Sequence, residues 1–103
     1  MKERIRQVKM LISEYTAEEN GLSALDGSEF LKANAENEER YRHIKTEIRA
    51  MAKKLGVRVI KPECDLITFW SRALHDIETL NSSLEETRRQ VCNFADNIRI
   101  IKQ

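Results

Sequence analysis

The sequence predicts an all-α protein in which two long helices form an antiparallel, coiled-coil-like hairpin and a shorter N-terminal helix packs on it. Only three glycines and one proline interrupt the 103 residues, whereas β-sandwiches and barrels need turn residues roughly every 8–12 positions. Apolar residues recur at alternating steps of three and four, which places them on one face of a helix. Hydrophobic residues make up 41% of the chain and charged residues 34%, which suits a single domain of exposed helices with narrow apolar stripes.

The first helix is predicted over residues 2–19. Asn20 and Gly21 follow it, and a glycine in the left-handed conformation commonly ends a helix. Its apolar face consists of Met1, Ile5, Val8, Ile12 and Tyr15.

The second helix is predicted over residues 27–55. Asp26 and Glu29 have the spacing of a capping box. In this motif the Asp26 side chain accepts a hydrogen bond from the backbone amide of Glu29, and the Glu29 side chain accepts one from the backbone amide of Asp26. Gly56 supplies the stop. The seam of this helix reads Phe30, Asn34, Asn37, Tyr41, Ile44, Ile48, Met51 and Leu55.

Residues 57–61 have strand character, but so short an extended segment cannot form a sheet alone. We therefore expect a connector that covers one end of the core. A connection of about six residues makes the flanking helices antiparallel neighbours.

The third helix is predicted over residues 62–102, with Pro62 in its first turn, where a missing amide costs nothing. Asn81, Ser82 and Ser83 could instead cap a new helix and divide the segment in two. We favour one continuous helix because the apolar register passes through these residues unchanged. Its seam reads Leu66, Trp70, Ala73, Ile77, Leu80, Leu84, Thr87, Val91, Phe94, Ile98 and Ile101.

An antiparallel alignment of the second and third helices would bring Asn34, Asn37 and Thr87 into one polar layer. A buried asparagine fixes the register of paired helices because slippage leaves its amide without a partner. Alternatively, the hairpin opens at this level and the asparagines are hydrated. The sequence leaves both interpretations open.

The C-terminal part of the third helix should extend beyond the end of the second helix, which leaves its apolar residues uncovered. Ile5 and Val8 of the first helix could cover only part of this surface. We therefore expect a second protein, either another copy of the chain or another helical subunit, to bind there. The predicted partner-binding residues are Ile5, Val8, Val91, Phe94, Ile98 and Ile101.

No catalytic, metal or cofactor site is predicted. Glu39, His43 and Glu47 share a helical face, but nothing supplies further firm ligands, so we interpret them as a solvated face with charge pairs. Cys64 and Cys92 lack neighbouring ligands or bases and are expected to be free thiols, as in a reducing compartment.

The net charge of +1 offers no global attraction to nucleic acid or to an acidic membrane. Basic residues do gather before and after Gly56, but cations near a helix C-terminus are also what the helix dipole favours, so nucleic-acid binding is the less favoured reading. These residues are Lys45, Arg49, Lys53, Lys54, Arg58 and Lys61.

The sequence therefore predicts a non-enzymatic structural or adaptor protein that assembles through helical packing. It contains no apolar run long enough to cross a bilayer and no secretion signal, so we expect an intracellular protein, cytoplasmic or nuclear, without a membrane partner. The alternative function is a small secretion or assembly chaperone that holds a partner's amphipathic helix.

Overall fold

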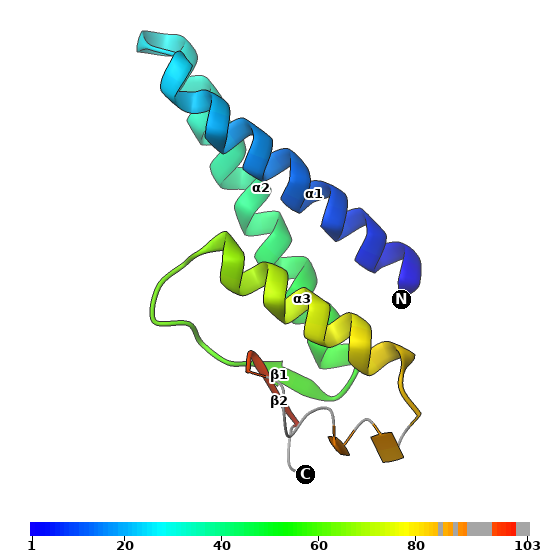
Figure 1. The fold of residues 1–103 in the computed structure, drawn as a ribbon. Coiled ribbons are helices and arrows are strands. Elements are labelled where there is room, and N and C mark those ends of the chain that lie inside the picture. Colours follow the sequence, from blue (N-terminus) through cyan, green and yellow to red (C-terminus); the bar gives the residue numbers. More distant parts are fainter. Residues whose placement is uncertain (85, 88, 91–95, 101–103) are drawn as a thin grey trace.

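The computed structural model describes residues 1–84, 86–87, 89–90 and 96–100. This part of the chain is mainly helical, with one short antiparallel pair of strands (Figure 1). The elements in chain order are α1 (Lys2–Gly21), a 3₁₀ turn (Leu22–Ala24), α2 (Gly27–Lys54), β1 (Val57–Val59), α3 (Ile67–Ser82) and β2 (Ile98–Ile100).

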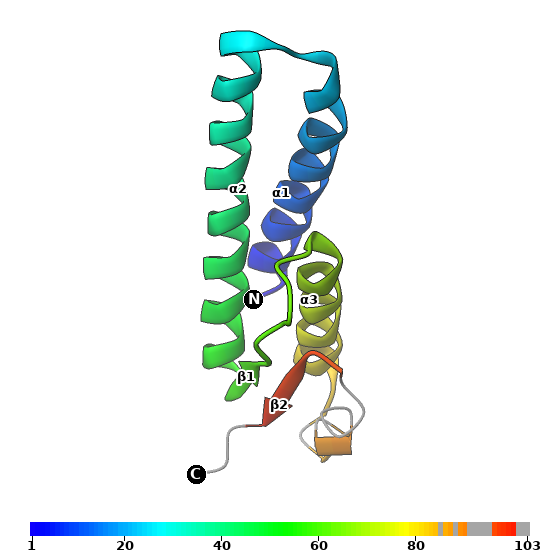
Figure 2. The same cartoon turned by 90° about the vertical axis from the view of Figure 1, so that its left-hand side faces the viewer.

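α1 and α2 run antiparallel and are joined at one end of the molecule through the 3₁₀ turn (Figures 1 and 2). Gly21 keeps right-handed helical dihedrals, so the expected left-handed stop is wrong there. The left-handed residue of this connection is Gly27, with φ +63°, and Gly56, with φ +77°, ends the second helix as predicted.

Asp26 is the N-cap residue of α2, as predicted, but the expected capping box does not form. Its backbone is extended, and its side chain makes no hydrogen bond to the first turn. The carboxylates of Asp26 and Glu29 are therefore left exposed to solvent at the end of the helical pair.

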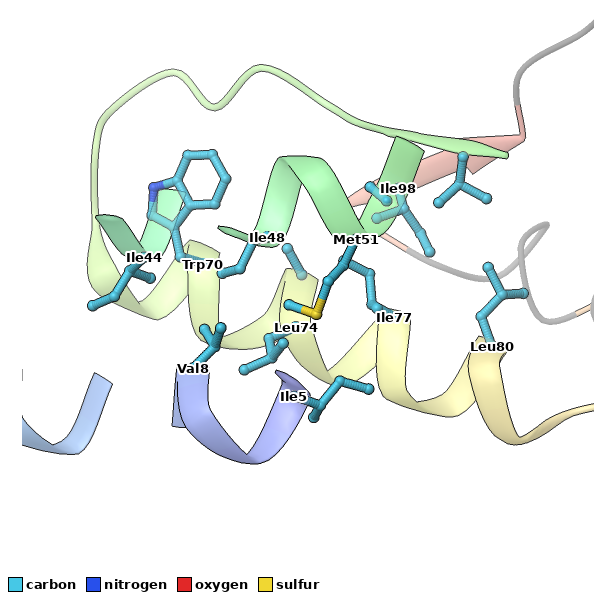
Figure 3. Close-up of a cluster of buried hydrophobic side chains, with 13 residues drawn as sticks. Ile5, Val8, Ile44, Ile48, Met51, Trp70, Leu74, Ile77, Leu80 and Ile98 are labelled. Carbon is cyan, nitrogen blue, oxygen red and sulfur yellow. The ribbon is translucent and has the colours of Figure 1, made fainter. Parts of the chain in front are cut away.

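α3 is parallel to α2, so the expected antiparallel pairing of the second and third helices is wrong. In Figure 3 the residue numbers rise in the same direction along both helices, with Trp70 beside Ile44 and Ile77 beside Met51. An ion pair of 3.1 Å between Lys45 and Asp65 holds the start of α3 at this level.

The physical reason is the length of the connection. The third helix begins at Ile67 and not at Pro62, so residues 60–66 form an irregular return after β1, with bends at Glu63 and Cys64. Seven residues could span about 20 Å if fully extended, so even with two bends the connection is long enough to carry the chain back alongside α2 before α3 begins.

The predicted helix 62–102 is also wrong in its C-terminal part. α3 ends at Ser82, and Ser83 takes extended dihedrals. Ile98–Ile100 forms β2, which pairs antiparallel with β1 in the register Val57 with Ile100 and Val59 with Ile98. The segment that we expected to be a lone connector is thus one strand of a two-stranded ribbon.

The core lies where α1, α2, α3 and the ribbon meet (Figure 3). Trp70, which lies on the predicted seam of the third helix, is fully buried there. α3 covers only part of the α1–α2 pair, and the joined end of that pair extends beyond it (Figures 1 and 2). The buried apolar residues of the cluster are Ile5, Val8, Ile44, Ile48, Met51, Ala52, Val57, Trp70, Ala73, Leu74, Ile77, Leu80 and Ile98.

Candidate functional site

The net charge of +1 conceals two oppositely charged ends. Residues 13–39 contain eight acidic residues and one lysine, whereas residues 40–61 contain eight basic residues and one glutamate. Because α1 and α2 are antiparallel, the basic N-terminal turns of α1 lie beside the basic half of α2 (Figure 2). The joined end of the helical pair is therefore acidic and the opposite end is basic.

We call residues 13–39 the acidic arm. α3 reaches only the start of the arm, where Ser13 lines a groove with Ser71 and Leu74 of α3. In the rest of the arm α1 and α2 pack on each other without α3, so the apolar seam is covered from fewer sides than in the core (Figure 2). Tyr15 of the arm contacts Tyr41, with ring centroids 5.2 Å apart.

Asn37 is buried in the arm, with 1% of its surface exposed. Its amide nitrogen donates to the backbone oxygen of Tyr15 and to a carboxylate oxygen of Glu19, both at 3.2 Å. Its amide oxygen accepts from Arg40 Nη1 at 2.7 Å. A buried asparagine thus ties α2 to α1.

The predicted polar layer of Asn34, Asn37 and Thr87 is not formed. Asn34 is partly exposed and donates to Glu38 at 3.4 Å, and Thr87 is exposed. The prediction failed because it aligned α2 with the third helix, whereas the partner of Asn37 is α1.

Phe30 and Leu31 are exposed next to each other near the free end of the acidic arm, by 36% and 67% respectively. The carboxylates of Asp26 and Glu29 precede them in the sequence, and neither forms an ion pair with another residue that the structure describes. We call these four residues the tip. Other exposed large apolar residues, such as Met10, lie singly on separate elements, which is usual for a protein surface.

A groove of about 370 Å³ lies at the basic end, between the last turns of α2 and β1. Its lining is apolar at Ala52, Val57 and Val59, which we call its floor, and basic at Arg49, Lys53 and Arg58, which we call its rim. We call it the basic groove. The ion pairs found between described residues involve none of the three rim cations.

A third arginine, Arg99, lies next to the groove-lining Arg58. Arg58 of β1 is directly opposite Arg99 of β2 in the ribbon. Arg99 also donates to the backbone oxygen of Ile98 at 2.9 Å. The ribbon thus adds positive charge to the end of the molecule that holds the groove.

Tyr41, Lys45, Asp65 and Trp70 form a polar cluster where α3 begins. The Lys45 ammonium lies 5.2 Å from the ring centroid of Tyr41 and 5.9 Å from that of Trp70. Burial, with a smaller contribution from the Asp65 charge, raises the pKa of Tyr41 to about 12.

The nearby indole N–H of Trp70 opposes part of this rise in the pKa of Tyr41. The geometry of a hydrogen bond is nevertheless not reached, and both polar atoms are buried without a partner among the described residues. These two buried polar atoms therefore lower the stability of the folded state slightly.

The predicted partner-binding residues are only partly testable. Ile5, Val8 and Ile98 are buried in the core of a single chain, so the expectation that they are free to bind a partner is wrong. We expected Ile98 on the exposed face of a long helix, but it lies in β2 and its side chain is buried. Val91, Phe94 and Ile101 lie outside the described residues.

Glu39, His43 and Glu47 are not gathered as a metal site. Arg42 pairs with Glu39, and Arg4 of α1 pairs with Glu47 at 2.6 Å. This hydrogen bond from Arg4 lowers the pKa of Glu47. No group of three potential metal ligands occurs among the residues that the structure describes. Cys64 is an exposed free thiol, and Cys92 lies outside the described part.

None of the helices in the described segments is both long and apolar enough to span a membrane. Comparisons with protein-family models, with curated proteins and with solved structures give no match. The candidate sites are therefore defined by the chemistry of this chain alone: an acidic tip with an apolar pair of residues, and a basic groove with an apolar floor.

Proposed function

We propose that this protein is a non-enzymatic adaptor or structural subunit that assembles with another protein through its acidic arm. In most of the arm, two helices share a seam that α3 does not reach (Figure 2). A partner that packs against this end in a coiled-coil-like manner would cover apolar surface that the chain itself leaves in water.

The proposal depends on the exposure of Phe30 and Leu31. Burying such a side chain in an interface contributes roughly 1.5–3 kcal/mol, so this pair could supply a large share of a binding energy. The neighbouring carboxylates keep the free tip soluble and give the contact an electrostatic preference.

A second candidate is a holding role for a partner's helix, as in a small assembly chaperone. A groove of about 350 Å³ runs between α1 and α2 and includes Met10, Leu11, His43 and Glu47. It could accept one or two apolar side chains of an amphipathic helix. This role requires a free chain that is stable, whereas a structural subunit gains stability from its partner.

The first test is sedimentation equilibrium of the parent chain, Leu31→Gln and the control Leu66→Gln. Leu66 is a suitable control because it is similarly exposed, by 56%, but lies outside the arm. We expect self-association that Leu31→Gln weakens at least about ten-fold and Leu66→Gln leaves unchanged.

If the parent is monomeric, the test for a foreign partner is a photo-crosslinking amino acid placed at position 31 or at position 66 in cells. The proposal predicts one adduct of defined mass from position 31, lost in the Phe30→Gln background and absent from position 66. A monomeric parent without such an adduct refutes the proposed function.

A further inference from the structure

We propose that the tip of one copy binds in the basic groove of a second copy, so that the protein assembles head to tail. This inference rests on the proposed adaptor function and names the partner of the arm as the chain itself. The contact would join Phe30 and Leu31, with Asp26 and Glu29 beside them, to the groove between α2 and β1.

The two surfaces have complementary chemistry. The tip offers two adjacent apolar side chains flanked by carboxylates that form no capping bond. The groove offers an apolar floor with cations around it. Its volume of about 370 Å³ lies within the range of cavities that bind ligand groups. An apolar group can thus enter the groove while its acidic neighbours meet the rim.

The charges at both surfaces are available for such a contact. Lys53 and Arg58 form no ion pair with any other described residue, and Arg49 lies over the ring of Trp70 at 5.1 Å.

A single chain cannot make this contact with itself. Leu31 and Lys53 lie near opposite ends of the continuous helix α2 (Figure 2). Their separation along the helix is about 33 Å at a rise of 1.5 Å per residue. A tip can therefore reach only the groove of another molecule. A bound pair keeps one free tip, on one copy, and one free groove, on the other, so the contact propagates into rings or open filaments.

A polyanion such as RNA is the competing occupant of the groove. Contacts with a phosphate backbone need cations and hydrogen-bond donors, but they make no use of an apolar floor. In addition, none of the described residues that line the groove is aromatic, so they offer no ring on which bases could stack. The acidic and apolar tip uses both the rim and the floor, so we favour it.

The test uses two variants of the full chain that should each be monomeric. Leu31→Gln removes an apolar side chain from the tip, and Lys53→Glu/Arg58→Glu reverses two rim charges of the groove. Lys2→Glu/Arg6→Glu is the matched control, because it makes the same charge change at the basic end but outside the groove. Thermal unfolding of each variant alone checks that it is folded.

The measurement is sedimentation velocity of each variant and of the equimolar mixture. In the mixture, the intact tip of the groove variant can bind the intact groove of the tip variant. We expect a 1:1 dimer that does not grow further, although neither variant associates alone, while the Lys2→Glu/Arg6→Glu control assembles like the parent. Assembly of the parent should weaken at least ten-fold between about 50 and 500 mM NaCl, as expected for opposed charges.

Other outcomes overturn the inference in distinguishable ways. If Lys53→Glu/Arg58→Glu assembles like the parent while Leu31→Gln is monomeric, the arm binds another surface, and only the head-to-tail contact is refuted. A parent that stays monomeric but binds a fluorescent 20-nucleotide poly(U) through the rim cations assigns the groove to a polyanion. A parent that does neither also refutes the contact, and crosslinking at position 31 then decides the proposed function separately.

Discussion

At the scale of single residues, Asn37 shows how a polar side chain can be buried at little cost. Both of its amide atoms have partners, in Tyr15, Glu19 and Arg40. A satisfied buried amide contributes specificity because a shift of α2 along α1 would leave the amide without partners.

Asn37→Asp should destabilise the protein by about 2–3 kcal/mol at neutral pH, because a carboxylate would replace the amide that donates to Tyr15 and Glu19. The loss should shrink as the pH falls and the new carboxyl group is protonated. Urea unfolding at neutral and acidic pH measures both effects. The same change at the partly exposed Asn34 serves as the control, and an equal loss there would contradict the role assigned to Asn37.

The Arg4–Glu47 pair links α1 to α2 and makes part of the stability dependent on pH. Arg4 lowers the pKa of Glu47, so the folded state favours the ionised carboxylate. The contribution is complete above the ordinary pKa of glutamate and is lost as the pH falls through the lowered folded value. In Glu47→Gln this part of the acid-induced loss should be absent. Parallel acid titrations of thermal stability test it, and identical slopes would exclude the linkage.

Tyr41 makes the stability of the folded state fall as the pH rises into the alkaline range, the opposite of the effect of Glu47. Its pKa is raised to about 12, so the neutral phenol is favoured in the folded state. Its contribution is complete below the ordinary pKa of tyrosine and is lost as the pH rises toward about 12. Tyr41→Phe removes a buried hydroxyl that has no hydrogen-bond partner among the described residues, and it should leave stability at neutral pH unchanged or raise it by up to about 1 kcal/mol. Urea unfolding checks the stability, and ultraviolet absorbance follows the tyrosine titration.

At the scale of elements, the first two helices could be predicted from the sequence because their signals are local. The periodic apolar residues set the extent of α1 and α2, and Gly56 marked the end of α2. The direction of α3 could not be predicted in this way. It depends on where the return after β1 ends, which is fixed by long-range contacts such as that between Lys45 and Asp65.

The end of α3 shows that an unbroken apolar register does not guarantee an unbroken helix. The hydroxyl groups of Ser82 and Ser83 donate to backbone oxygens four residues earlier. Such bonds compete with the regular helical ladder and favour a bend or an end. Leu84, which the register assigned to the seam, is 81% exposed.

The strand pair had a signal that could have been found. Residues 57–59 read Val-Arg-Val and residues 98–100 read Ile-Arg-Ile, the same alternation of β-branched and charged residues. The helical register through Ile98 concealed the second segment. A strand signal without a partner should therefore prompt a search for a matching pattern elsewhere in the chain.

The two isoleucines of β2 test this assignment. Ile98 is fully buried, whereas Ile100 is 42% exposed. Ile98→Ala should destabilise the monomer by about 2–5 kcal/mol, and Ile100→Ala should cost less than about 1 kcal/mol. Chemical denaturation of the two variants at several protein concentrations separates a loss of folding from a loss of assembly. Equal effects would contradict the burial of Ile98 in the core.

At the scale of the whole molecule, the separation of charge was present in the sequence but hidden in its total. The charges of the acidic block (residues 13–39) and of the basic block (residues 40–61) cancel, and only the path of the helices shows that the two blocks occupy opposite ends (Figure 1). The basic residues of the groove could be identified from the sequence. The apolar floor could not, because Val57 and Val59 reach it only through the strand.

The acidic arm should be less stable locally than the rest of the helical pair. Backbone amides of residues 44–52 lie in the core, where α1, α3 and the ribbon surround α2, whereas those of residues 28–34 lie in the arm. Hydrogen exchange followed by mass spectrometry should therefore show faster exchange in residues 28–34. Equal protection would mean that the arm is covered, and a dependence on protein concentration would identify the cover as a second copy.

The strand pair also has a consequence for folding on the ribosome. Ile98 completes the cluster around Met51 and Ile77, yet it is synthesised after every other member of that cluster. Pairing Val59 with Ile98 closes a loop of about 40 residues, a slow and non-local step. During translation the three helices are therefore made before Ile98, and their hydrophobic core lacks this side chain until β2 is synthesised. A nascent chain arrested shortly before Ile98 should accordingly be digested by protease much faster than one that includes β2.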